Sequence, residues 1–353
     1  RVVAFDIGRS AYKYAKAIEG HHSTLRLGEG PRIAPLLGLD NPMQFDDLFS
    51  WLITFTEVWS GRACNVKELE DMRYALQGVR EAIPARDRRL SDLGRLVQTP
   101  ELRSIFEQAR GSLLDAAHDA FAFADDGVPY WCFEIGELGL DNPRWTVPTI
   151  LALQRRALAE FARGDSTPTL VTVDEGARAL KIPKMQDFAE RIQREGRKNR
   201  VQFTFATQGV GEIVRSPIRD VLIEQTVTKI AMANRDANGD VIRREYLEVG
   251  FSPDDVETIA TMGEYDILIR NEYGVQVVRL DPGAAELSIY GGAGNEDCEI
   301  VDAYIRRFGA GAWVDPYLTD NGRPLEDHPN EAPYALAAPL PDNSPALAES
   351  VPC

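Results

Sequence analysis

Two adjacent carboxylates at the end of an apolar run are the residues best suited to chemistry in this sequence. The run Leu-Val-Thr-Val at residues 170–173 ends in Asp174 and Glu175. Ligands of parallel α/β sheets bind beyond the carboxyl ends of the strands. There an aspartate can hold a hydrated Mg²⁺ through water, and a glutamate can act as general base toward an attacking water. This Walker B pattern predicts Asp174 as nucleotide and Mg²⁺ ligand and Glu175 as catalytic base; a strand that merely ends in two acids is the alternative.

A second polar strand end follows along the chain. The run at residues 201–206 ends at Thr207 and Gln208, and a glutamine there could orient water or sense a terminal phosphate. Between the two runs, residues 191–200 carry five cations, among them Arg197 and Arg200. Such a cluster usually forms a solvated helix face. In an oligomeric nucleotidase it could instead supply a catalytic arginine to the phosphates of a neighbouring subunit.

These residues need a parallel sheet to bring them together. Short apolar runs that end at polar residues are typical of buried parallel strands, and alternating strands and helices indicate an α/β fold. Four runs are therefore predicted to share one mainly parallel sheet: residues 2–5, 130–133, 170–173 and 201–206. A helix over residues 11–18, capped by Ser10, is predicted to follow the first strand.

The pattern changes in the middle of the chain and at its end. Residues 44–125 lose the strand pattern and show helical spacing, including a predicted helix over residues 101–121, so they are interpreted as an all-helical insertion. The core is expected in two parts, residues 1–43 and 126–318. The remaining 319–353 are proline-rich and are predicted to be a disordered tail.

Composition excludes several classes of protein. Asp and Glu outnumber Lys and Arg by 55 to 39, and the net charge of −16 disfavours general DNA coating and direct DNA binding. The four cysteines and four histidines form no cluster at zinc-ligand spacing along the chain, which argues against a structural zinc site. No P-loop pattern G-x-x-x-x-G-K-[ST] occurs in the sequence.

Five stretches together resemble the type IV secretion and conjugative-transfer ATPases, the CagE–TrbE–VirB family of P-loop NTPases. The most diagnostic is Arg-Lys-Asn at 197–199 followed by Ala-Thr-Gln at 206–208, after the Asp-Glu strand. The others are residues 5–10, 133–134, 173–175 and 280–287. There are departures: Ile7 stands where the family usually has lysine, and residues 176–178 differ from its usual Ala-Trp. The family's P-loop precedes the strand that opens this chain, so truncation upstream of Arg1 is the expectation.

The resemblance implies a fold, cofactors and partners. The implied fold is a RecA-like P-loop NTPase core, with a mainly parallel sheet flanked by helices. ATP and Mg²⁺ are the implied cofactors, with Asp6, Arg9 and Arg200 among the nucleotide contacts. The implied partners are further copies of the chain, plausibly in a hexamer, and the inner-membrane and cytoplasmic components of a type IV secretion machine. The implied location is cytoplasmic and peripheral at the bacterial inner membrane.

Three functions remain open at this stage. The first is an ATPase motor that energises pilus assembly and substrate transfer. The second is a DNA-pumping coupling ATPase of the related conjugation class, which the negative charge disfavours. The third is a non-catalytic scaffold with a degenerate NTPase fold. The presence of Asp174, Glu175 and Gln208 together argues against it.

Overall fold

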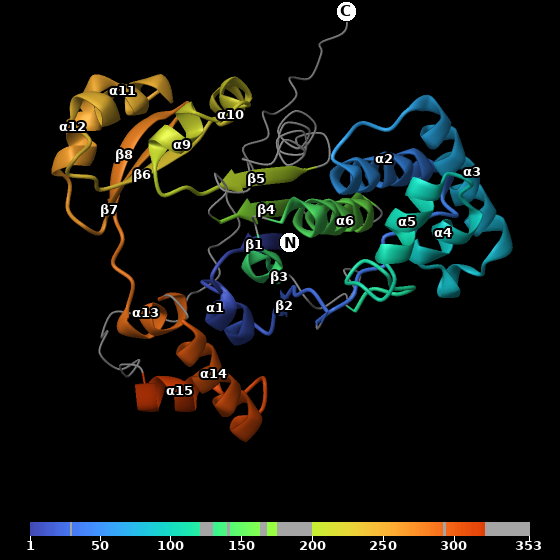
Figure 1. Cartoon of the computed structure of the whole chain (residues 1–353). Helices are drawn as coiled ribbons and strands as arrows, with labels where there is room; N and C mark the ends of the chain where they lie inside the picture. The colour runs from blue at the N-terminus through green and yellow to red at the C-terminus, as the bar shows by residue number, and fades with distance from the viewer. Residues whose placement is uncertain are drawn as a thin grey trace, which may run out of the picture.

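The computed structural model describes residues 1–28, 30–120, 130–139, 142–162, 168–174, 200–291 and 294–321. Its centre is a five-stranded sheet in the order β2-β3-β1-β4-β5, in which every neighbouring pair is parallel (Figure 1). The strands are β1 (Val2–Asp6), β2 (His21–Thr24), β3 (Tyr130–Glu134), β4 (Thr169–Val173) and β5 (Val201–Phe205). The four strands predicted to share one parallel sheet are confirmed.

The two faces of this sheet are covered by different helices. Val3 and Phe5 of β1 and Phe133 of β3 pack in one large core with Ile150 and Leu153 of α6 (Pro143–Ala162). On the opposite face a smaller cluster of Ala4, Tyr130 and Cys132 contacts Ala15 of α1 (Tyr12–Ala17). All five residues of β3 are buried, as is usual for a strand in the interior of a parallel sheet.

The strand β2 was not predicted. His21–Thr24 is polar and only four residues long, so it lacks the apolar pattern of a buried strand. It pairs along the outer edge of β3, with His22 opposite Cys132. The free hydrogen-bonding groups of β3, rather than any local preference of residues 21–24, account for this strand.

The helical region begins at Pro42, close to its predicted start. It contains α2 (Pro42–Ser60), α3 (Val66–Ala82), α4 (Leu93–Leu96), α5 (Pro100–Gln108) and the short 3₁₀ turns η1 (Ala85–Asp87) and η2 (Leu90–Asp92). Of residues 44–120, which the structure describes, none lies in a strand. These helices share the large core with the sheet, and Trp51 Nε1 donates to the Pro148 carbonyl at 2.9 Å, which ties α2 to α6. The division into separate domains therefore stays a prediction.

One predicted helix is too long. The helix predicted over residues 101–121 ends at Gln108. Gly111 adopts a left-handed φ of 73°, and its N–H donates to Asp115 Oδ2 at 2.8 Å. This turn buries Leu113 and Leu114, which a continuing helix would not place together against the core.

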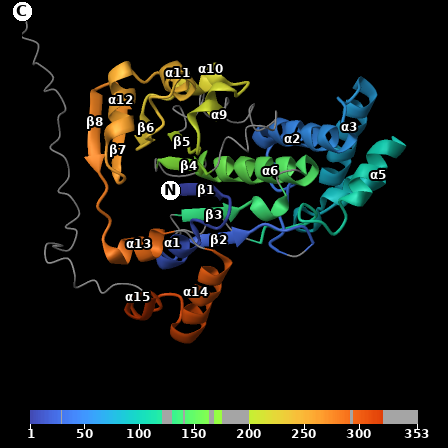
Figure 2. The same cartoon turned by 60° about the vertical axis from the view of Figure 1, so that its left-hand side comes forward.

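A second, antiparallel sheet lies apart from the first in both ribbon views (Figures 1 and 2). It has the order β6-β7-β8, with β6 (Lys229–Met232) followed by the hairpin of β7 (Asp266–Asn271) and β8 (Gly274–Arg279). The nearby helices are α9 (Val210–Val214), α10 (Arg219–Gln225), α11 (Asp240–Glu248) and α12 (Pro253–Thr261). Ser252 caps α12, because its Oγ accepts from Asp255 N at 3.2 Å.

Three helices close the described chain: α13 (Ala284–Tyr290), α14 (Asn295–Phe308) and α15 (Val314–Asn321). The tail was predicted to start at residue 319, but residues 319–321 belong to α15, where Tyr317 and Leu318 pack on Trp313. The rest of the predicted tail lies outside the described residues. No helix in the described part of the chain is long and apolar enough to span a membrane.

Candidate active site

Three carboxylates meet at the carboxyl edge of the central sheet. Asp6 is the last residue of β1 and lies opposite Glu134, the last residue of β3. Asp174 directly follows β4, and its N–H donates to the carbonyl of Phe5 at 3.0 Å. The sheet therefore brings Asp6 and Asp174 together at the edge where ligands of parallel α/β sheets bind.

The hydroxyl of Ser10 lies between two of these carboxylates. Its Oγ is 2.5 Å from Asp6 Oδ1 and 3.1 Å from Asp174 Oδ2. A serine hydroxyl carries one proton, so it donates to only one of the two at a time. The other carboxylate then faces an oxygen lone pair, and the two negative charges lie close together. This arrangement favours a cation at the edge of the sheet.

Ser10 does not cap the helix that follows, which corrects the prediction. The N-cap of α1 is Ala11, which makes no side-chain capping bond. The carboxylate of Asp6 acts there instead, because its Oδ2 accepts from Ala11 N at 2.9 Å. The hydroxyl of Ser10 therefore contacts Asp174. The sequence did not predict this contact, because Ser10 matches the pattern of a helix cap.

Glu134 holds the loop that carries Ser10. Its Oε2 accepts from Arg9 N and its Oε1 from Gly136 N, each at 2.6 Å. Gly8 and Arg9 have φ of 90° and 60°, and these left-handed conformations turn the loop back over the carboxylate. Burial raises the pKa of Glu134, the backbone N–H groups act against this, and the charge of Asp6 adds to it.

Gly136 is required by the same carboxylate. A Cβ at this position would lie 2.7 Å from Glu134 Oε1, closer than a methyl group and an oxygen can approach. In the sequence, Phe133 and Glu134 indicate only a resemblance to the family. The structure shows Glu134 as a positioning residue for the loop between β1 and α1.

Arg9 is already engaged at this edge. Its guanidinium forms an ion pair with Glu137 of η3 (Gly136–Leu138), and Glu137 Oε1 also accepts from Arg26 Nη2 at 3.0 Å. A nucleotide would have to compete with Glu137 for the guanidinium of Arg9. The nucleotide contact of Arg9 therefore stays a prediction.

The remaining predicted site residues that the structure describes, Gln208 and Arg200, lie at opposite ends of the central sheet. Ala206 N donates to Val173 O at 3.1 Å, so the exposed Gln208 lies just beyond the same edge as Asp174. Arg200 precedes β5, and its carbonyl accepts from Thr169 N at 2.9 Å, at the opposite, amino end of the sheet. The backbones of Arg200 and Asp174 therefore lie at opposite ends of β4, whose length is roughly 15 Å at about 3.3 Å per residue. Glu175 and Arg197 lie outside the described residues.

The donors at this edge fit a magnesium ion. Mg²⁺ prefers oxygen ligands and usually keeps several waters while it binds one or two carboxylates. Asp174 and Asp6 supply carboxylate oxygens, and Ser10 adds a hydroxyl oxygen within hydrogen-bond distance of both. The edge can therefore hold a hydrated cation.

The architecture is that of the P-loop NTPase fold found in VirB4. The structure aligns with VirB4 of Thermoanaerobacter pseudethanolicus with a TM-score of 0.64 and 15% sequence identity, over 81% of this chain and 83% of that one. The likeness confirms the predicted fold class, a mainly parallel sheet flanked by helices.

Sequence comparison identifies homologues among proteins of conjugation and type IV secretion. The chain is 28% identical to the conjugal transfer protein TrbE of Rhizobium radiobacter over 91% of its length. It is 24% identical to the type IV secretion system protein VirB4 of Bartonella quintana over 67% of its length. These matches span only 39% of the TrbE relative and 30% of the VirB4 relative. No family model matches the sequence.

Proposed function

We propose that this chain belongs to the ATP-hydrolysing subunit of a motor that energises a type IV secretion or conjugative-transfer system. The observation that supports this most is the Ser10 hydroxyl between Asp6 and Asp174, at the carboxyl edge of a parallel sheet. The homology to TrbE and VirB4 proteins indicates that the process is conjugative transfer or type IV secretion. ATP hydrolysis would drive pilus assembly and substrate transfer.

In this proposal each residue of the edge has one task. Asp174 supports Mg²⁺ through water, and Asp6 with Ser10 fixes the position of its carboxylate. The ion would neutralise the charge of the nucleotide phosphates. Glu175 acts as the general base toward water, and Gln208 orients that water from the neighbouring strand.

The arginines are proposed to act between subunits. Arg200 lies at the amino end of the sheet, remote from the Asp174 of its own chain. Residues 191–200, with Arg197, are therefore proposed to contact the nucleotide of a neighbouring copy in a homo-oligomer, for which a hexamer is plausible. Arg9 would contact the nucleotide only by leaving Glu137.

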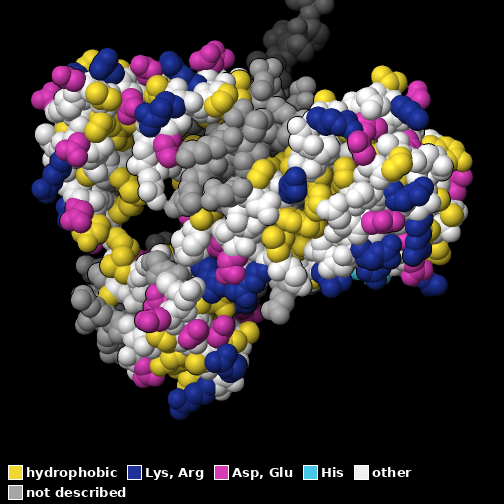
Figure 3. All heavy atoms as spheres, in the orientation of Figure 1, with side chains coloured by type: hydrophobic (Ala, Val, Ile, Leu, Met, Phe, Trp, Pro, Cys, Tyr) yellow, Lys and Arg dark blue, Asp and Glu magenta, His cyan; other side chains and the backbone are white. Residues whose placement is uncertain are grey.

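The proposed partners are the inner-membrane and cytoplasmic components of the secretion machine, with the protein in the cytoplasm and peripheral at the inner membrane. Direct DNA binding is not part of the proposal, because the net charge is −16. Figure 3 shows basic and acidic side chains interspersed over the helical region on the face in view.

A mating assay tests this function. Donor cells that lack the gene are complemented with the wild type, with Asp174→Ala or with Asp315→Ala, a matched change on α15. The proposal predicts that the wild type and Asp315→Ala restore transfer while Asp174→Ala does not, at equal protein levels. Full restoration by Asp174→Ala would refute the motor function and favour a scaffold.

A further inference from the structure

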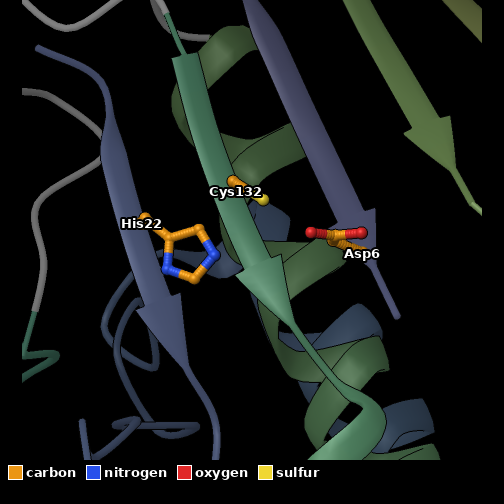
Figure 4. Close-up of side chains that lie close together, drawn as sticks. All are labelled: Asp6, His22 and Cys132. Atoms are coloured by element: carbon orange, nitrogen blue, oxygen red, sulfur yellow. The ribbon is translucent and has the colours of Figure 1, made fainter. Parts of the chain in front are cut away.

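We propose that Asp6, His22 and Cys132 form a binding site for a zinc ion. Within the described part of the chain, one carboxylate oxygen, one imidazole nitrogen and one thiol sulfur from these residues lie within 4.8 Å of one another. Figure 4 shows the imidazole and the carboxylate on either side of the Cys132 side chain. The three residues come from the adjacent strands β1, β2 and β3, so the sheet itself holds their backbones in place.

The ligand types point to zinc rather than magnesium. Zn²⁺ takes Cys sulfur, His nitrogen and carboxylate oxygen, whereas Mg²⁺ takes oxygen ligands. The set contains one donor of each of the three kinds that zinc accepts. A tetrahedral ion would keep a fourth position for a water molecule.

One nitrogen of the imidazole is left without a hydrogen bond in the described part of the chain. Nε2 of His22 is buried, and no described residue offers it a hydrogen-bond partner. A buried polar atom without a partner costs free energy, and coordination would remove that cost.

The charges balance when the thiol loses its proton. On binding, the S–H bond breaks, a Zn–S bond forms and the proton leaves to solvent. The thiolate and the Asp6 carboxylate then neutralise the two positive charges of the ion. Glu134 nearby favours the cation, while Lys16 and Arg9, which act on His22, oppose it.

The geometry needs only a local adjustment. Zn–S of about 2.3 Å and Zn–N of about 2.0–2.1 Å place ligand atoms roughly 3.3–3.6 Å apart. The three atoms must therefore approach by about 1 Å, which side-chain rotation on fixed strands can supply. The Asp6 carboxylate is already oriented by Ser10 and by the N–H of Ala11, as the outer shell of a metal site orients its ligands.

Such an ion would fasten the short edge strand β2 to β3 and β1. It would also fix Asp6, whose other contacts place Ser10 beside Asp174. The inference does not depend on the proposed ATPase activity.

Metal binding by the purified chain tests the site directly. The wild type is incubated with ZnCl₂ in excess MgCl₂, freed of unbound metal by gel filtration, and its zinc content measured. Co²⁺ is then titrated as a spectroscopic probe, since a cysteine ligand gives a thiolate-to-cobalt charge-transfer band. Cys132→Ala and His22→Gln are compared with Cys64→Ala and His118→Gln, which change a cysteine and a histidine outside the cluster.

The proposal predicts one zinc per wild-type chain, a charge-transfer band with Co²⁺, and at least tenfold weaker binding for Cys132→Ala and His22→Gln only. Circular dichroism verifies that each variant is folded. If either variant fails to fold, the band in the wild type still decides whether a thiolate binds the metal. Absence of stoichiometric zinc and of the band would overturn the proposal, as would a band that Cys64→Ala abolishes and Cys132→Ala retains.

Discussion

Replacing Asp174 by Asn separates the stability of the sheet edge from its capacity to hold a cation. The Asp174 side chain contacts the Ser10 hydroxyl, which lies closer to Asp6. Both carboxylate oxygens lie within 3.1 Å of the same hydroxyl, so they are at most about 6 Å apart. At that separation two unit charges repel by about 0.7 kcal/mol in water and about 2.8 kcal/mol at an effective dielectric constant of 20.

This repulsion offsets the hydrogen bond that the substitution weakens, about 0.5–1.5 kcal/mol at a partly exposed place. Asp174→Asn is therefore expected to change the free energy of unfolding by no more than about 1 kcal/mol. The matched control is Asp115→Asn. Asp115 is buried and accepts from Ser91 N at 2.9 Å, Ser91 Oγ at 3.1 Å and Gly111 N at 2.8 Å. Asparagine there turns an N–H₂ group toward donors and should cost about 3–5 kcal/mol.

The assay is urea unfolding of the three proteins with EDTA and with MgCl₂ at matched ionic strength. Mg²⁺ should stabilise the wild type and Asp115→Asn, by about 1.4 kcal/mol when its concentration is ten times its Kd. Asp174→Asn should gain little. The reasoning is refuted if Mg²⁺ stabilises Asp174→Asn as much as the wild type, or if Asp174→Asn loses as much stability as Asp115→Asn.

Three further predictions concern binding and packing. A P-loop supplies most phosphate contacts in P-loop NTPases and no such pattern occurs here, so calorimetry of this chain should show weak ATP binding or none; micromolar affinity would contradict this reasoning. Phe55 is fully buried, so Phe55→Ala should lower the free energy of unfolding by about 3–5 kcal/mol, against under about 1 kcal/mol for the exposed Tyr74→Ala. Hydrogen bonds from Arg62 lower the pKa of Glu68 to about 2, so its stabilisation is present above pH 4.5 and lost as the pH falls toward 2. The shift amounts to at most about 3.4 kcal/mol, and nearer 1–2 kcal/mol because Arg62 is half exposed. Glu68→Gln should therefore flatten acid unfolding between these pH values, and an unchanged profile would contradict the assignment.

The central strands were predictable because their burial appears directly in the residue types. Val2 to Phe5 and Tyr130 to Phe133 are apolar on both faces, and a sheet covered by helices on both sides requires that pattern. The acidic strand ends were predictable for the same reason, since a polar residue marks where burial stops. The edge position of Asp174 thus followed from the chain alone.

Contacts between distant segments were not predictable. His21–Thr24 forms a strand only because β3 offers it a free edge. Ser10 matches a helix cap, yet its hydroxyl contacts Asp174, 164 residues away. His22 and Cys132 are far apart along the chain and show no zinc-ligand spacing, although strand pairing sets them side by side. Each of these features depends on which strands become neighbours, and local patterns do not contain that information.

The most direct test of the ATPase proposal is the steady-state rate of ATP hydrolysis by the complete gene product, compared between the wild type and Glu175→Gln. Loss of a positioned general base typically costs about 10²–10⁴-fold in rate. The proposal predicts a loss of that size in turnover, with nucleotide affinity largely retained, and Glu245→Gln on α11 serves as the matched control with near-normal turnover. Turnover by Glu175→Gln close to that of the wild type would contradict the account.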